Sequence, residues 1–423
     1  MYYVFGAGIS GVAATRYILS PRGLNSDVTV IDANISKQDL AAKVGLDKSI
    51  PLLREISSSQ VSSEDILVPS PGISPSNPIY QTFINAGCSI VPEVDIPFTG
   101  YEGKLIAITG TNGKSTTTAM CTYLLTQIGI KAESAGNIGL SPCEVLLRPD
   151  SPEVICLELS SYQLEISKKL KPNVSIFTNF SSDHLERHKT LDNYFLAKWN
   201  LIENNLESPL ITSESTLEFA RKTNKTQPKN TVLIENVRST KFSLDKTLDG
   251  KHNQDNAVMA ALAVSEITGK NIDELLKLIS EFPGLPHRCE FVETNSSLTF
   301  VNDSKSTNVA STETALKSFK DELILILGGT AKPESFSPLS KYPNIQMVVA
   351  FGQDREKISS ELADKIPVVT TEGLSEAIKI SLTNSKENTK TILFSPACAS
   401  FDQFQNFEKR GEAFKQHLKK LVS

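Results

Sequence analysis

The sequence of 423 residues contains no run of about 18 apolar residues and no basic stretch ahead of an apolar one near its start. Its six cysteines lie far apart, and no two of them form a C-x-x-C pair. These absences argue against a transmembrane helix, a secretory signal, a disulfide framework and a structural zinc site. A cytoplasmic protein whose cysteines serve as small buried hydrophobic residues is expected.

Positive charge is not in excess either. Against 43 Lys and Arg residues stand 48 Asp and Glu residues, so the formal net charge is -5. This balance supplies no general attraction to nucleic acid or to an anionic membrane, and neither is predicted as a partner. Local groups must therefore bind any anionic ligand. The length suggests two or three domains at about 150 residues per domain.

Short apolar runs alternate with helical stretches along the whole chain, which predicts α/β layers with mainly parallel sheets. The strand-like runs are Tyr2–Phe5, Val28–Ile31, Leu105–Ile108, Val154–Leu157, Val174–Phe177, Leu298–Val301, Leu323–Leu327, Met347–Phe351 and Thr391–Phe394. Turn-rich segments at 97–103 and 283–286 divide the chain into three predicted domains, 1–97, 98–284 and 285–423. The stretch from about 206 to 250 is polar and weakly periodic, and it indicates no chemistry.

The first strand runs into a glycine-rich turn, Gly6-Ala7-Gly8-Ile9-Ser10-Gly11, and Asp32 closes the next strand. This is the G-x-G-x-x-G pattern, in which backbone N–H groups approach a phosphate. By itself it is compatible with a nicotinamide dinucleotide, with another nucleotide such as a UDP group, or with a tight turn of purely structural value. A second turn at 70–75 follows another strand-like run and would complete such a pocket.

The segment Thr109-Gly110-Thr111-Asn112-Gly113-Lys114-Ser115-Thr116 follows the strand at 105–108. Its backbone N–H groups and Lys114 would surround ATP phosphates, and the hydroxyl of Ser115 would bind Mg²⁺. Ile108 stands where the full G-x-x-x-x-G-K-[ST] pattern has its first glycine. The order of strand, loop and helix still favours phosphate binding.

Polar residues follow the next strands. Glu158 ends the strand at 154–157, where a P-loop enzyme needs a further Mg²⁺ ligand, although a surface glutamate is the simpler alternative. The segment 178–188 contains His184 and His188; a structural histidine is the default for His188, whereas His184 gains weight from its polar neighbours. Lys198, read from its spacing alone, would be a solvated cation on a helix.

Two asparagines precede an alanine-rich helix at 257–263. Asn253 and Asn256 would either cap this helix or contact an adenine edge. Arg288 lies at the second domain boundary, where it would reach phosphates with two parallel hydrogen bonds or remain a surface residue.

Three polar loops follow three strands of the last domain, at 302–308, 328–332 and 395–400. Two of these loops contain lysines, Lys305 and Lys332. An arrangement of this kind at one edge of a sheet suits an anionic amino-acid substrate.

Taken together, these motifs resemble the Mur ligase family, ATP-dependent enzymes that add amino acids to a UDP-muramoyl precursor of peptidoglycan. The resemblance spans nearly the whole chain, and the motifs occur in the family's order. Within the family, 160–164 (SSYQL) and 395–404 (SPACASFDQF) are similar to the branch that adds D-glutamate. The implied fold is an N-terminal Rossmann-like nucleotide-binding domain, a central P-loop ATPase domain and a C-terminal Rossmann-like domain.

The resemblance also implies roles for individual residues. ATP would be bound by Gly110, Thr111, Asn112, Gly113, Lys114, Ser115, Thr116, Asn253, Asn256, Arg288 and Asp303. Two Mg²⁺ ions would be held by Ser115, Glu158, His184 and a carbamylated Lys198, and the catalytic set would be Lys114, Glu158, His184 and Lys198. The UDP-substrate would contact Ser10, Gly72, Asn137 and Arg187, and D-glutamate would contact Lys305, Thr307, Lys332, Ser400 and Phe407.

The implied reaction joins D-glutamate to UDP-N-acetylmuramoyl-L-alanine through an acyl phosphate, in a monomeric enzyme. The sequence departs from the family pattern in two places: Asp32-Ala33-Asn34 lacks the hydroxyl residue and arginine often found after that aspartate, and Thr330 replaces a common acidic residue. The alternatives are a related ligase that adds another amino acid, or glutamates to folate. A nicotinamide-dependent oxidoreductase would leave 110–116 unexplained, and a non-catalytic P-loop regulator would not need His184 and Lys198.

Overall fold

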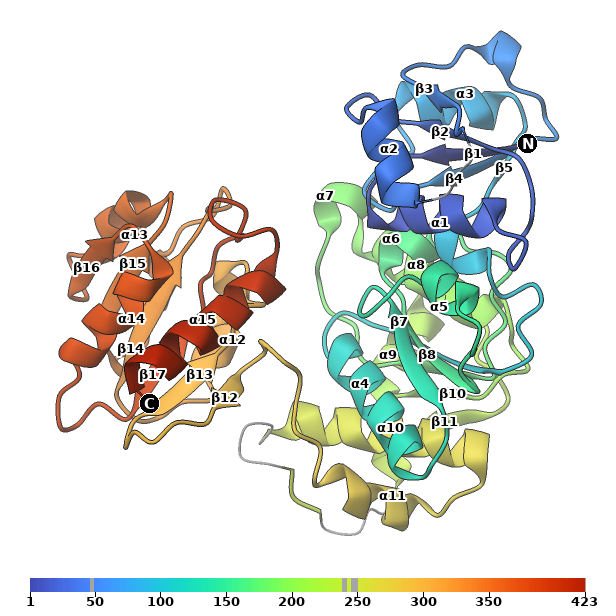
Figure 1. The fold of residues 1–423 in the computed structure, drawn as a ribbon. Helices are drawn as coiled ribbons and strands as arrows, with labels where there is room; N and C mark the ends of the chain where they lie inside the picture. The colour runs from blue at the N-terminus through green and yellow to red at the C-terminus, as the bar shows by residue number, and fades with distance from the viewer. Residues whose placement is uncertain (46–48, 238–241, 245–249, 423) are drawn as a thin grey trace. The chain divides into compact units, whose positions relative to one another are not determined.

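A computed structural model describes residues 1–45, 49–237, 242–244 and 250–422. The chain forms two compact units: the first ends at Phe282, and the second comprises the residues from Pro283 onward together with the short segment that includes Leu244 and Gly250. Three sheets are present, two in the first unit and one in the second (Figure 1). The chain is thus an α/β protein of several parts, as expected, and the boundaries at residues 97 and 284 stay a prediction.

The first sheet has five parallel strands in the order β3-β2-β1-β4-β5. Helices α1 and α2 pack on one face of it and α3 packs on the other, so both faces are buried. The elements of this part are β1 Tyr2–Phe5, α1 Ile9–Leu19, β2 Val28–Ile31, α2 Lys37–Val44, β3 Leu52–Leu53, η1 Ser58–Gln60, β4 Ile66–Pro69, α3 Pro78–Asn85, β5 Ser89–Ile90 and η2 Glu93–Asp95.

The second sheet has six parallel strands in the order β11-β10-β9-β6-β8-β7. Helices α5, α8 and α9 cover one face of this sheet. Helices α4 and α10 lie side by side; α4 packs against β7 and β8, and α10 packs against β9 and β10 (Figure 1). The elements are β6 Lys104–Thr109, α4 Lys114–Gln127, β7 Ala132–Gly136, α5 Pro142–Leu147, β8 Val154–Glu158, α6 Ser161–Leu164, β9 Val174–Phe177, α7 Leu185–His188, α8 Leu191–Glu203, β10 Leu210–Thr212, α9 Glu214–Lys222, β11 Thr231–Leu233, η3 Ile234–Asn236, α10 Lys251–Thr268 and α11 Ile272–Ile279.

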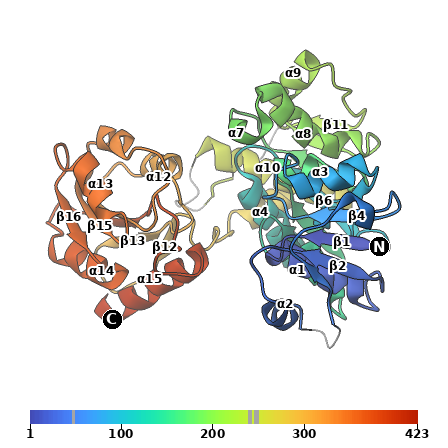
Figure 2. The same ribbon diagram turned by 90° about the horizontal axis from the view of Figure 1, so that it is seen from above.

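The sheet of the second unit has the order β12-β13-β17-β14-β15-β16, and only the pairing of β12 with β13 is antiparallel. Helices α12 and α13 cover one face, and α14 and α15 cover the other (Figure 2). The elements are β12 Glu290–Val292, β13 Thr299–Asn302, α12 Val309–Leu316, β14 Leu323–Gly328, η5 Ser337–Lys341, β15 Ile345–Phe351, α13 Arg355–Leu362, β16 Val368–Thr371, α14 Leu374–Thr383, β17 Thr391–Phe394 and α15 Phe407–Val422.

All the strands that the apolar runs predict are present to within two residues at either end. Two features of the secondary structure differ from what the sequence indicated. The polar stretch after residue 206 contains β10, α9 and β11, whose short apolar segments are too weak to stand out in a polar sequence. Helix α10 begins at Lys251, so Asn253 and Asn256 lie within its first turns and do not cap it.

All six cysteines are free; four are buried, and Cys88 and Cys289 are half-buried. The expected burial therefore holds for most of them. Among the described helices, none combines the length and the apolar character needed to cross a bilayer.

Within the first unit, two buried carboxylates of η2 form hydrogen bonds that connect the part of the chain with the first sheet to the part with the second. Asp95 is 4% exposed and accepts hydrogen bonds from the Ser167 hydroxyl at 2.6 Å and from the backbone N–H groups of Lys168 and Lys169 at 2.9 and 3.1 Å. Glu93 accepts from the Ser141 hydroxyl and from the Cys143 N–H. Both contacts join residues that are far apart in the sequence.

We expect Asp95→Ala to lower the free energy of unfolding by about 3 kcal/mol, because it leaves the buried Ser167 hydroxyl and two partly buried backbone N–H groups without their acceptor. The measurement is urea unfolding followed by the fluorescence of Trp199, the one tryptophan of the chain, which is buried in this unit. The control is Asp150→Ala, since Asp150 forms an exposed ion pair with Lys131 and such pairs contribute little to stability. Equal effects of the two changes would contradict the assigned role of Asp95.

Candidate functional site

The P-loop connects β6 to α4 at the carboxyl end of the central sheet. Gly110 and Gly113 have φ angles of 139° and 82°, which residues with a Cβ rarely adopt. A Cβ on Gly110 would lie 2.0 Å from the Thr178 hydroxyl, and one on Gly113 would lie 2.4 Å from Oδ1 of Asn256. The loop therefore requires glycine at both positions, and its shape is the one expected for phosphate binding.

Residues that follow β9 form hydrogen bonds with the P-loop. The backbone N–H of Thr111 donates to the carbonyl of Asn179 at 2.9 Å, and the N–H of Asn112 donates to the Asn179 side chain at 3.0 Å. The Thr178 hydroxyl donates to the Asn112 carbonyl at 2.6 Å. Lys114, the first residue of α4, donates from Nζ to the Thr111 carbonyl at 2.7 Å. The loop is thus ordered by hydrogen bonds within the protein.

Helix α10 also lies against the P-loop. Asn256 is 4% exposed and lies next to Gly113, and its amide donates to the Asn253 side chain at 3.4 Å. The structure therefore brings Asn256 to the loop, with Asn253 beside it, although more than 130 residues separate them from the loop in the sequence.

Lys198 lies in α8 with a side chain that is 1% exposed, so the view of it as a solvated helix cation is wrong. Its Nζ donates to the Gly110 carbonyl at 2.7 Å and lies 4.7 Å from the centre of the Tyr194 ring. Burial, and then the positive charge of Lys114, hold the pKa of Lys198 well below its usual range; Asp183 and Glu158 oppose this shift. The Lys198 ammonium group therefore loses its proton more readily than that of an exposed lysine.

Glu158 ends β8 and is 1% exposed. Its Oε1 accepts from the Asn137 amide at 2.8 Å, while its buried Oε2 has no hydrogen-bond partner among the described residues. A buried carboxylate oxygen without a partner is costly unless a cation or a donor occupies the site. The surroundings of Glu158 therefore fit a bound cation such as Mg²⁺, which prefers oxygen ligands.

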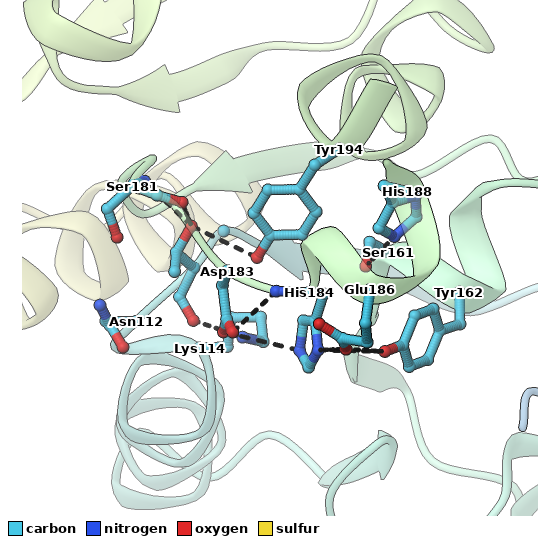
Figure 3. A network of polar contacts seen from close by, with 12 residues as sticks. Asn112, Lys114, Ser161, Tyr162, Ser181, Asp183, His184, Glu186, His188 and Tyr194 are labelled. Carbon is cyan, nitrogen blue, oxygen red and sulfur yellow. Dashed lines mark hydrogen bonds and ion pairs between the residues drawn. The ribbon is translucent and has the colours of Figure 1, made fainter. Parts of the chain in front are cut away.

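A polar cluster around His184 lies beside the P-loop (Figure 3). His184 precedes α7 with a left-handed backbone, φ 50°. Its Nδ1 lies 3.0 Å from the Tyr162 hydroxyl, and its Nε2 lies 3.6 Å from a carboxylate oxygen of Asp183. The Tyr162 hydroxyl is also 3.4 Å from Glu186.

His188 is a buried structural histidine, as expected from the sequence. It is 5% exposed, its Nε2 shares a hydrogen bond of 2.9 Å with the Ser161 hydroxyl, and burial lowers its pKa. Arg187 pairs with Glu165 at 2.9 Å and donates to the Ile73 carbonyl at 3.3 Å. It thereby links the central sheet to the turn that contains Gly72.

The two turns of the first sheet lie together, as expected. The Ser70 hydroxyl donates to the Gly6 carbonyl at 3.3 Å, and Ser10 lies in the first turn of α1. Both carboxylate oxygens of Asp32 accept from backbone N–H groups, of Ala7 on one side and of Asn34 and Ile35 on the other. These hydrogen bonds keep the pKa of Asp32 below its usual range although partial burial, the largest single influence, raises it. Asp32 therefore shapes the glycine-rich turn.

In the second unit, β13, β17 and β14 are neighbours in the sheet, so the three polar loops leave one edge. Lys305 Nζ lies 4.4 Å from the centre of the Phe407 ring, and the Ser304 hydroxyl donates to the Phe407 carbonyl at 2.8 Å. Ser400 is buried, and Thr307 is half-buried, whereas Lys332 is exposed. Lys305 thus lies beside the first residue of α15, and a shared site for all five residues stays a prediction.

Asp303 and Arg288 belong to this unit as well. Asp303 is 2% exposed and accepts from the Cys289 N–H at 3.1 Å and from the Ser395 hydroxyl at 2.7 Å. Burial raises its pKa. Its carboxylate therefore organises the edge of the sheet, and a contact to a nucleotide ribose stays a prediction.

Sequence reasoning missed several residues of these clusters. Arg410 is fully buried, and its guanidinium donates to Ser304, to the Gly328 carbonyl and to the Cys398 carbonyl, so one side chain joins all three loops. Asn179, Asp183 and Tyr162 were not singled out, although all three follow strands of the central sheet. Their position directly after a strand could have identified these three residues. No feature of the sequence marks Arg410, which lies within α15.

No group of three or more His, Cys, Asp or Glu side chains gathers into a metal site among the residues that the structure describes.

Comparison with known proteins identifies the family of this chain. The sequence matches the Mur ligase middle domain over residues 108–234 and the Mur ligase glutamate ligase domain over residues 287–398. UDP-N-acetylmuramoylalanine–D-glutamate ligase of Leptospira interrogans is 35% identical, covering 97% of this chain and 94% of that protein. The protein of the same name from Aquifex aeolicus is 34% identical, with coverages of 98% and 97%.

Solved structures are similar in fold at lower identity. UDP-N-acetylmuramate–alanine ligase of Thermotoga maritima superposes with a TM-score of 0.60 at 19% identity, covering 98% of both chains. MurF ligase of Thermotoga maritima, solved with ADP, gives a TM-score of 0.56 at 16% identity, covering 86% of this chain and 97% of that one. With a P-loop beside a buried glutamate and relatives that are similar over their full length, the chain belongs to the Mur ligase family.

Proposed function

We propose that this protein catalyses the ATP-dependent addition of D-glutamate to UDP-N-acetylmuramoyl-L-alanine in peptidoglycan precursor synthesis. The names of its relatives in several bacteria support this activity. The observation that carries the chemistry is the P-loop with two fully buried ionisable side chains near it, Glu158 and Lys198. A fold alone would not justify the reaction, because function depends on the residues of the site.

The reaction requires activation of a carboxylate. The alanyl carboxylate oxygen attacks the γ-phosphorus of ATP, the bond to the β-phosphate oxygen breaks, and ADP leaves. The amine of D-glutamate then attacks the acyl carbon, phosphate leaves, and the nitrogen loses a proton. Lys114 and the N–H groups of 110–116 would neutralise and orient the transferred phosphate, which is the main contribution of a protein to phosphoryl transfer.

Four residues are proposed to hold Mg²⁺: Ser115, Glu158, His184 and Lys198. Bound Mg²⁺ would neutralise the charge of the ATP phosphates as the phosphoryl group moves. The unpartnered Oε2 of Glu158 supports its part in this set. Lys198 would join as a carbamate, because burial lowers the pKa of its amine and so favours the neutral form, and it is the neutral amine that adds CO₂ with loss of a proton.

The remaining predicted contacts are distributed over both units. ATP would also contact Asn253, Asn256, Arg288 and Asp303, and the close packing of Asn256 on Gly113 supports the first pair. The UDP-substrate would contact Ser10, Gly72, Asn137 and Arg187. D-glutamate would contact the residues at the edge of the second sheet: Lys305, Thr307, Lys332, Ser400 and Phe407. A cytoplasmic monomer remains the expectation from the sequence.

The amino-acid specificity can be tested directly. We expect D-glutamate to stimulate ADP release in the presence of ATP, Mg²⁺ and UDP-N-acetylmuramoyl-L-alanine, whereas L-alanine and meso-diaminopimelate should not. A coupled assay of ADP release measures this, and reactions without the UDP-substrate serve as the control. Equal stimulation by all three amino acids would refute the specificity and favour another ligase of the family.

A further inference from the structure

The Tyr162 hydroxyl contacts both His184 and Glu186, and the reaction proposed above gives Tyr162 no role. Tyr162 lies in α6, whose N-terminus is fixed by a capping box between Ser160 and Gln163. Its ring stacks on His188 with centroids 5.7 Å apart and planes at 19°, and the Arg187 guanidinium lies 5.5 Å from the ring centre. These contacts fix the ring and hence the position of its hydroxyl, which lies next to His184 (Figure 3).

The hydrogen bonds of this hydroxyl decide which nitrogen of His184 carries a proton. A neutral imidazole has one N–H, and its position follows from the partner of the other nitrogen. If Tyr162 donated to Nδ1, the proton of His184 would be on Nε2, which is 3.6 Å from Asp183 and thus too far for a hydrogen bond. The Tyr162 oxygen would then also face the Glu186 carboxylate, 3.4 Å away, without a proton between them.

The opposite arrangement satisfies every contact. Nδ1–H of His184 donates to the Tyr162 oxygen over 3.0 Å, and the Tyr162 O–H donates to Glu186 over 3.4 Å. Nδ1 also lies 3.4 Å from the same Glu186 oxygen, so a proton on Nδ1 faces both acceptors. Nε2 then presents a lone pair near Asp183, and two acceptors face each other with no proton between them. A divalent cation is the natural partner for such a pair, and outer hydrogen bonds of this kind commonly orient histidine ligands.

We infer that Tyr162 and Glu186 form a hydrogen-bond relay that holds His184 in the Nδ1–H form, so that Nε2 is available to a divalent cation. Tyr162 is thus a positioning residue that acts through His184. The inference rests on the proposed role of His184 as a metal ligand. The tautomer itself is a property of the metal-free protein and is measured separately from metal binding.

The first measurement is the histidine ¹H–¹⁵N correlation spectrum of the metal-free full-length protein, in which the two tautomers of neutral histidine have distinct patterns. His184→Gln identifies the signal among the five histidines. We expect the Nδ1–H pattern in the unaltered protein and a shift toward Nε2–H in Tyr162→Phe, which keeps the ring and removes the hydroxyl. Glu186→Ala should shift the tautomer in the same direction, because Tyr162 would then donate to Nδ1.

The second measurement is Mn²⁺ affinity, followed by electron paramagnetic resonance in the presence of a non-hydrolysable ATP analogue. Tyr162→Phe should weaken Mn²⁺ binding by about 10–100-fold, the usual effect of removing an outer partner of a metal ligand. The matched control is Tyr123→Phe, whose ring packs edge-on against Phe282, and it should change neither measurement.

Two results would overturn the relay: an Nε2–H pattern in the unaltered protein, or a tautomer that Tyr162→Phe leaves unchanged. If His184→Gln binds Mn²⁺ as tightly as the unaltered protein, the proposed metal role of His184 is wrong. A tautomer that still shifted in Tyr162→Phe would show that this failure lies in the metal assignment and not in the hydrogen-bond relay.

Discussion

Lys114→Ala is expected to lower turnover by about 10²–10³-fold while leaving the fold intact, because a charged group that stabilises the moving phosphate is worth that much in comparable sites. Its Nζ donates to the Thr111 carbonyl within the loop itself, and Lys114 is not a member of the apolar core cluster of this unit. The measurement is ADP release at saturating substrates, accompanied by urea unfolding monitored at Trp199. Stability should change little.

The control for this experiment is Lys131→Ala, which removes an exposed lysine paired with Asp150. It should retain full turnover, since exposed ion pairs matter little. A folded Lys114→Ala protein with the activity of the control would refute the assignment of residues 110–116 as the phosphate site.

Lys198→Ala is expected to lower turnover by at least about 10²-fold, and a small carboxylate such as formate should restore part of it. Carbamylation changes the side chain from a cation to an anion, and an anion attracts Mg²⁺ where the ammonium would repel it. An added carboxylate, or bicarbonate, supplies the missing oxygens in the space left by the lysine. Activity as a function of formate concentration measures the rescue.

Two further variants make this test decisive. Lys198→Arg keeps a cation that does not form the carbamate, so it should be as inactive as the alanine variant and should not respond to formate. Lys222→Ala removes an exposed lysine of α9 and should behave as the unaltered protein with or without formate. Full activity of Lys198→Arg would show that the lysine acts only through its position in the helix.

Local sequence predicted much of this protein because the relevant physics is local. Buried parallel strands produce continuous apolar runs, and the polar residues directly after them must lie at the carboxyl edge of the sheet. Glu158 and the loop at 110–116 were identified in this way. Gly113 precedes a helix and has a left-handed backbone, which is a requirement that the residue type itself reveals.

Tertiary structure decided the features that depend on residues distant in the sequence. Lys198 appears solvated from its spacing in α8, and it is buried only because the helix packs with this residue beneath the Gly110 carbonyl. Arg410 joins three loops from a helix near the C-terminus, and no periodicity marks it. The proton position on His184 likewise depends on Tyr162, 22 residues earlier. Sequence thus determined which strands end in polar residues. The packing of helices onto those strand ends decided the charge and orientation of the side chains, because contacts across the fold set their burial and hydrogen-bond partners.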